Sequence, residues 1–182
     1  FLIFLFGLSN ALDYGEKFTK GLTFIALITD TQWNTTDAIV TAATIDISKD
    51  KFNYKQHKKD AYKLIVILFA TSLLMFILLY RFYNLDLVIT LIYFGFEIVN
   101  FAIYPIYRIK TCYLQLEWSV VKITSNKILA CVLRLFMSFL RTPFCTGIGQ
   151  VCSSIYQFIT VSIFFKLYYE VDKEGNVISK SR

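Results

Sequence analysis

Several stretches of this sequence are apolar for long enough to cross a lipid bilayer, and this feature constrains the fold most. A membrane-spanning helix needs about 20 consecutive, mostly apolar residues. Residues 62–82 and 86–107 have this character, and 56% of the 182 residues are hydrophobic while only 18% are charged. Soluble domains average about 45–50% apolar and about 25% charged residues. The sequence therefore predicts an all-α membrane protein and argues against a disordered chain, a fibre or a soluble enzyme.

Six helical stretches can be delimited by the charges that flank them. They cover residues 1–12, 18–46, 62–82, 86–107, 124–141 and 146–169. Pro143 separates the last two, because the residue before a proline disfavours the helical conformation. The chain begins without methionine and inside an apolar run, so we expect a fragment, a processed chain or one lobe of a larger protein.

Basic residues gather in alternate connections between these stretches. The connections 47–63 and 108–127 and the end of the chain carry most of the lysines and arginines. Such residues accumulate on the cytoplasmic side of a membrane. We therefore expect a multi-pass bundle in the cell membrane over residues 1–170, with both ends in the cytoplasm, and a polar cytoplasmic tail over residues 171–182. The net charge of +6 is then a topology signal, and no nucleic-acid partner is expected.

The connections and the tail carry few chemical signals. Glu174-Gly175-Asn176 indicates a turn, within a small hairpin or a linker. His57 is the single histidine and lies among lysines, which favours a solvated loop. The four cysteines lack metal-ligand spacing, so we expect neither a metal nor a cofactor. No nucleophile–base pair or catalytic motif is visible, which argues against an enzyme.

The stretch 18–46 is unusually polar for a membrane helix. Its candidates for a binding site are Asp30, Gln32, Trp33, Asn34 and Asp37. Because an aspartate in mid-membrane costs about 2.5–3.5 kcal/mol, these side chains should face protein or water. Asp30, Trp33 and Asp37 share one helical face by their spacing. This face lines a polar cavity or, alternatively, the stretch is two short helices joined by a loop at residues 29–36 near the aqueous boundary.

Three further polar residues interrupt the later apolar stretches. They are Glu97, Asn100 and Arg134. Glu97 and Arg134 are a natural pair, because an isolated charge in this environment is costly. As a structural feature the pair would staple two helices together, and as a functional one it would be a gate that opens during transport. Gly149 and Ser153 are spaced to let another helix backbone approach closely.

The order of these elements resembles a known transporter family. A polar second helix and a basic connection precede two apolar helices, a charged connector with Tyr113-Leu114-Gln115, and a last helix containing GIGQVCSSIYQF. This order is similar to one six-helix lobe of the multidrug/oligosaccharidyl-lipid/polysaccharide flippase superfamily, in its polysaccharide-exporter branch. The resemblance implies transport of a lipid-linked saccharide or another amphiphile, coupled to a cation or proton and completed by a second lobe. By position it implies Asp30, Asp37 and Arg134 as cavity residues.

A second interpretation is also open. A small, self-contained membrane protein of six helices would show the same apolar pattern. It would act as an immunity or accessory factor or as a subunit of a larger complex, with membrane lipids and another subunit as partners and without transport activity. A reading frame of about twice this length with a second helical set would favour the lobe.

Overall fold

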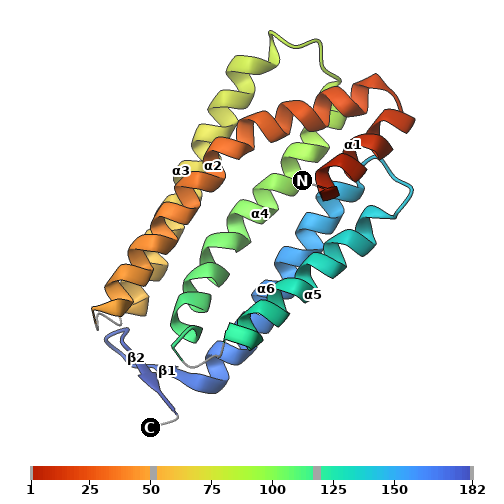
Figure 1. The fold of residues 1–182 in the computed structure, drawn as a ribbon. Coiled ribbons are helices and arrows are strands. Elements are labelled where there is room, and N and C mark those ends of the chain that lie inside the picture. Colours follow the sequence, from red (N-terminus) through yellow and green to blue (C-terminus); the bar gives the residue numbers. More distant parts are fainter. Residues whose placement is uncertain (1, 50–52, 117–119, 181–182) are drawn as a thin grey trace.

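The computed structural model describes residues 2–49, 53–116 and 120–180, and within these ranges the chain forms six helices and one hairpin (Figure 1). In chain order these are α1 (Leu2–Asp13), α2 (Glu16–Ser48), α3 (Tyr54–Tyr80), α4 (Leu87–Leu114), α5 (Val120–Ser138), α6 (Cys145–Tyr168), β1 (Tyr169–Val171) and β2 (Val177–Ser179). The all-α class is confirmed. Residues 1, 50–52, 117–119 and 181–182, which belong to the predicted first span, connections and tail, lie outside the described residues.

Helix α4 is the centre of the bundle. It packs against α2, α3 and α6, while α5 packs against α6 and α1 contacts α2, α5 and α6. Figure 1 shows the pair α2 and α3 on one side of α4 and the pair α5 and α6 on the other. The two larger clusters of buried apolar residues lie around Phe24, Phe76 and Phe94 and around Tyr113 and Phe165, and a smaller one contains Leu64, Leu68 and Phe101. The two larger clusters fix both ends of the bundle.

Three of the helices in the described ranges, α3, α4 and α6, are long and apolar enough to cross a membrane. The described part of α1 has 12 residues, which is shorter than the roughly 17 that a span needs. Helix α2 is too polar, and α5 carries Lys122, Lys127 and Arg134. The structure therefore supports a membrane-embedded bundle in which three helices could cross the membrane, and it does not support the six predicted spans.

Helix α2 is continuous over 33 residues, so the alternative of two short helices joined by a loop at residues 29–36 is wrong. Its threonines explain how a polar sequence keeps the helix intact. The hydroxyls of Thr29, Thr36 and Thr41 each donate to the backbone carbonyl four residues earlier, at 3.0, 3.2 and 2.9 Å. A hydroxyl bonded in this way is satisfied inside its own helix and needs no loop.

The basic segment after residue 53 is a helix and not a loop. Asn53 caps α3 by accepting a hydrogen bond from the backbone N–H of Gln56 at 3.0 Å. Lysine is a good helix former, so the run of charges continues into the apolar span. The prediction of a solvated His57 is consequently wrong. The ring is 8% exposed, with Nδ1 at 2.8 Å from the Tyr113 hydroxyl and Nε2 at 3.4 Å from the Asp46 carboxylate.

The predicted polar tail begins as a docked hairpin. Strands β1 and β2 pair antiparallel, and the predicted turn lies between them. Gly175 adopts φ 96°, a conformation that L side chains rarely take, and its carbonyl accepts from the Lys55 N–H at 3.2 Å. The Tyr169 hydroxyl donates to the Tyr113 carbonyl at 2.7 Å. These bonds attach the hairpin to α3 and α4.

Helix α4 is longer than predicted. It passes through Pro105, which is fully buried, and ends at Leu114 instead of at residue 107. Tyr113 and Leu114 therefore belong to the last turn of a buried helix, and Gln115 is its C-terminal cap. The residues Tyr113-Leu114-Gln115, which the family resemblance placed in a connector, therefore form the end of a helix.

Candidate functional site: a polar groove between α2 and α5

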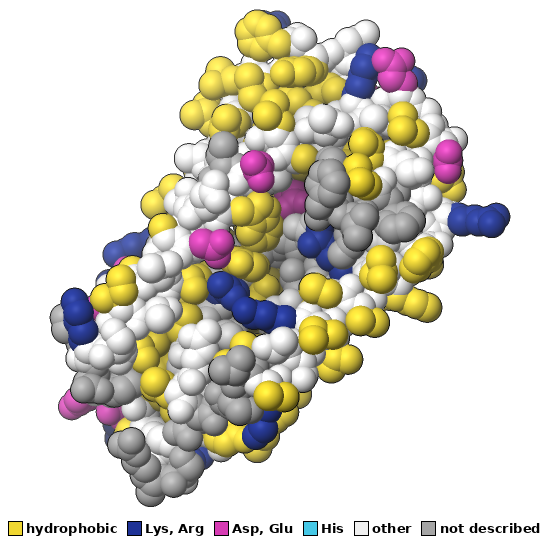
Figure 2. Space-filling view, viewed as in Figure 1, with side chains coloured by type: hydrophobic (Ala, Val, Ile, Leu, Met, Phe, Trp, Pro, Cys, Tyr) yellow, Lys and Arg dark blue, Asp and Glu magenta, His cyan; other side chains and the backbone are white. Residues whose placement is uncertain are grey.

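A groove of about 480 Å³ opens on the face where α2 and α5 form the walls and α4 and α6 the floor. Figure 2 shows this face hollowed, with acidic and basic side chains at and inside the hollow. The charged, amide and indole groups that line it are Asp30, Trp33, Glu97, Arg134, Gln150 and Gln157. Some of the polar residues that the sequence predicted for a cavity therefore line this groove together, although they belong to separate helices.

Glu97, Gln150 and Arg134 form a hydrogen-bonded chain across three helices. The guanidinium of Arg134 on α5 donates to Gln150 Oε1 on α6 at 3.0 Å. Gln150 Nε2 in turn donates to the Glu97 carboxylate on α4 at 3.3 Å. An amide is suited to this position because it accepts from a cation at one end and donates to an anion at the other. The predicted pair is therefore joined through Gln150.

Small residues on α6 bring its neighbours close enough for this chain. A Cβ added at Gly149 would lie 3.0 Å from the Arg134 carbonyl oxygen and 3.2 Å from Met137 Cβ. A Cβ at Gly147 would overlap the ring of Phe96 on α4. The close approach predicted for Gly149 is thus observed between α5 and α6, and it places Arg134 opposite Gln150.

An aromatic wall leads from the groove to its rim. Trp33 packs edge-on against Tyr104, with ring centroids 4.7 Å apart. The Tyr104 hydroxyl donates to Asp37 Oδ1 at 3.1 Å, and the Arg108 guanidinium lies 3.8 Å from the same oxygen. Asp37 does not line the groove itself, and 59% of its side chain is exposed. Its partners hold it beside the opening.

Three of the predicted site residues lie elsewhere. Gln32 is buried on the side of α2 that faces α3, where its Oε1 accepts from the Thr71 hydroxyl at 3.4 Å. Asn34 is exposed and outside the groove lining. Asn100 is fully buried one turn along α4 from Glu97 and does not line the groove. The structure therefore does not bring these three side chains into the groove lining. Gln32 and Asn34 are turned away from it because neighbours in sequence point to different sides of a helix.

The groove offers both charge types in a confined space. Arg134 can give charge-assisted hydrogen bonds to a phosphate or a carboxylate, and Glu97 can take up a proton or a cation. Over the described ranges no group of three or more His, Cys, Asp or Glu side chains is placed to hold a metal ion. Comparison of the chain with protein-family models, curated proteins and solved structures gives no match.

Proposed function

We propose that the chain is one lobe of a multi-pass transporter, in which the groove binds the polar part of a lipid-linked saccharide or another amphiphile. The observation that carries this proposal is the Glu97–Gln150–Arg134 chain inside a bundle with three helices that are long and apolar enough to cross a membrane. Charges inside a membrane protein are expensive and usually mark the path of a substrate or an ion. The groove volume of about 480 Å³ lies within the range of small-molecule sites.

The open side of the groove also supports a second lobe or subunit. Asp30 and Asp37 on α2 are exposed there, and acyl chains would not solvate their carboxylates. A facing protein surface or a water-filled cavity would solvate these carboxylates. In the proposed arrangement all six helices reside in the cell membrane, both ends lie in the cytoplasm, and α2 and α5 face the second lobe.

The hydrogen-bonded chain offers a way to couple cargo to an ion. An anionic group bound by the Arg134 guanidinium competes with Gln150 for its donors. Release of Gln150 weakens its bond to Glu97, and that carboxylate then gains a proton or a cation. In this scheme the chain is a gate, and without cargo it staples α4, α5 and α6 together.

The proposal is tested in proteoliposomes that contain the full-length protein and a fluorescent polyprenyl-diphosphate-linked N-acetylglucosamine. A membrane-impermeant reductant quenches only the label in the outer leaflet, so further quenching measures flipping, with and without a proton gradient. We expect Glu97→Gln and Arg134→Gln to slow flipping by about 10–100-fold, because each removes a charge-assisted hydrogen bond worth about 1.5–3 kcal/mol.

Asn34→Ala is the matched control, since Asn34 is a polar residue of α2 outside the groove. It should flip the lipid at the wild-type rate. Equal slowing in all three variants, or normal flipping in the groove variants, would overturn the proposal. A wild-type protein that flips no faster than empty vesicles, for this and other amphiphiles, would favour an accessory or subunit role instead.

A further inference from the structure

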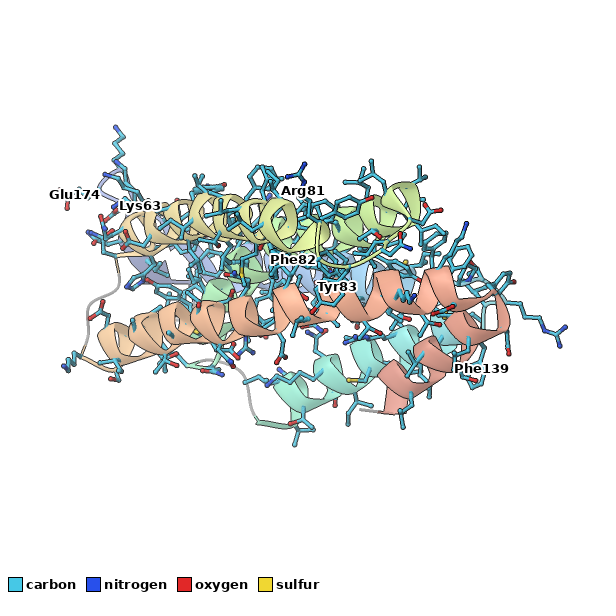
Figure 3. All side chains as sticks on the ribbon, turned by 90° about the horizontal axis from the view of Figure 1, so that it is seen from above. Lys63, Arg81, Phe82, Tyr83, Phe139 and Glu174 are labelled. Carbon is cyan, nitrogen blue, oxygen red and sulfur yellow. The ribbon has the colours of Figure 1, made fainter. Side chains whose placement is uncertain are left out.

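A second groove lies beside the hairpin at the start of α3, and its chemistry differs from that of the first groove. It is lined by Asn53, Lys55, Gln56, Lys58, Lys59, Tyr62, Lys63, Val66, Ile67 and Glu174. Its volume is about 900 Å³, and four of its side chains are lysines. Figure 3 shows Lys63 and Glu174 at the same end of the molecule. Nothing in the proposed transport path uses this surface.

Three of the four lysines of this groove lack an anionic partner among the described residues. Lys63 lies 3.4 Å from Asp60, but no carboxylate of the described chain lies within ion-pair distance of Lys55, Lys58 or Lys59. The groove lining therefore contains four lysines and, among the described residues, a single acid, Glu174.

The position of these lysines at the N-terminal end of α3 makes an anion bound there more favourable. The N-terminal end of a helix carries a partial positive charge and favours acidic side chains. The first turn of α3 has none, and Lys55 is its second residue. The sequence therefore adds cations where the helix is already positive, which an anion bound nearby would offset.

The same groove changes from basic to apolar along the helix. Lys55, Lys59, Tyr62 and Val66 recur at spacings of three and four, so they share one face. Val66 and Ile67, at the inner end, are 67% and 56% exposed. Lys58 lies over the Tyr62 ring at 5.7 Å. A charged head would meet the lysines while an apolar chain beside it would meet Val66 and Ile67.

The hairpin holds one wall of the groove in place. The Lys55 N–H donates to the Gly175 carbonyl at 3.2 Å, and a Cβ at Gly175 would overlap the Lys55 side chain. The turn is thus in tight contact with the first turn of α3. The groove therefore lies between two elements in direct contact, the hairpin turn and α3.

We propose that this groove binds an anionic phospholipid of the surrounding bilayer, with its headgroup on Lys55, Lys58 and Lys59 and an acyl chain along Val66 and Ile67. Charge complementarity selects the anionic headgroup, since basic residues next to a membrane-spanning helix attract anionic lipids. The continuous apolar strip selects a lipid over a free phosphate or an acidic protein, because neither of these would use it. The site is independent of the proposed transport function.

Lipid binding is measured on the purified full-length protein in detergent by native mass spectrometry, with dioleoyl phosphatidylglycerol and dioleoyl phosphatidylcholine as probes. We expect the phosphatidylglycerol to bind at least tenfold more tightly. The double variant Lys58→Gln/Lys59→Gln should lose about tenfold or more of that affinity, since each lysine near a surface contributes substantially to anionic-lipid binding. Glu174→Gln should tighten it about two- to threefold, because it removes the acid from the groove.

The matched control is Lys122→Gln/Lys127→Gln on α5, which removes the same charge from exposed lysines outside the groove. It should keep wild-type affinity within about twofold. Equal losses in both double variants would reduce the effect to overall charge and overturn the proposal. Equal binding of the two lipids, or displacement of the phosphatidylglycerol by 10 mM inorganic phosphate at constant ionic strength, would overturn it as well.

Discussion

Helices α2 and α3 pack side by side, yet their outer faces have opposite chemistry. Helix α3 exposes Val66, Leu74 and Ile77, which are 67%, 56% and 59% exposed. Helix α2 exposes Asp30, Asn34 and Asp37. An apolar side chain on the outside is stable in lipid, whereas a carboxylate there is not. The comparison teaches that the outer face of α3 is suited to lipid, whereas the outer face of α2 is suited to a polar surrounding.

Their inner faces both contribute apolar side chains to the contact with α4, although α2 also buries Thr29, Gln32 and Thr36. Leu64 and Leu68 of α3 pack with Phe101 of α4, and Trp33 of α2 packs against the same cluster. Both helices are thus held to α4 by ordinary apolar burial.

The strongest way to test this separation is to remove an inner side chain of α3. Leu68 is fully buried, and Leu68→Ala should lower the free energy of unfolding by about 2–5 kcal/mol through lost burial and a residual cavity. Leu74→Ala, on the outer face, should change it by less than about 0.5 kcal/mol. Denaturant unfolding in detergent measures both. Similar losses for the two variants would mean that the outer face of α3 is also packed against protein.

A carboxylate on the outer face of α3 should affect membrane insertion instead. Leu74→Asp should cost about 3 kcal/mol of insertion free energy if α3 crosses the bilayer. Asn34→Asp, the equivalent change on α2, should cost far less, because that face already carries Asp30 and Asp37. Glycosylation-site mapping in microsomes gives the inserted fraction. Loss of insertion in the α2 variant alone would reverse the assignment of the two faces.

The same two helices show what the sequence could and could not provide. Long apolar runs must form helices in a membrane, so the helices were predictable with errors at their ends. His57 was misplaced because its neighbours are charged, although Tyr54, His57, Ala61, Leu64 and Leu68 are spaced by three and four. That period marks the buried face and would have corrected the prediction.

The groove was less predictable than the helices that form it. Asp30, Trp33, Glu97 and Arg134 were found because charges and an indole stand out in apolar stretches. Gln32 and Asn34 were included as sequence neighbours, but a helix turns by about 100° per residue and directs them elsewhere. The bridging position of Gln150 depends on how α4, α5 and α6 pack, and no spacing within one helix encodes it.

The two helices also differ at their N-termini. Asn53 caps α3 through its side chain, whereas Gly15 precedes α2 without a side-chain cap. Asn53→Ala should therefore lower stability by about 1 kcal/mol, and Asn53→Asp should restore most of it. Thermal unfolding in detergent measures the effect, and hydrogen exchange at Gln56 locates it. Equal stability of Asn53→Ala and the wild type would show that the docked hairpin alone holds the start of α3.

The smallest effect concerns the hairpin turn that docks on α3. The Asn176 N–H, at 2.8 Å, and the Gly175 N–H, at 2.6 Å, donate to the Asp172 carboxylate. The hydrogen bond from the Asn176 N–H is the main cause that holds the pKa of Asp172 below its usual value of 3.8, and the bond from Gly175 adds to it. A lowered pKa means that the ionised group stabilises the turn above about pH 4 and that this contribution is lost as the pH falls through the pKa of the folded protein. Hydrogen exchange at Gly175 and Asn176, corrected for its intrinsic pH dependence, should accelerate slightly below that pH. Asp172→Asn should abolish the transition, and a transition that persists in this variant would assign it to another group.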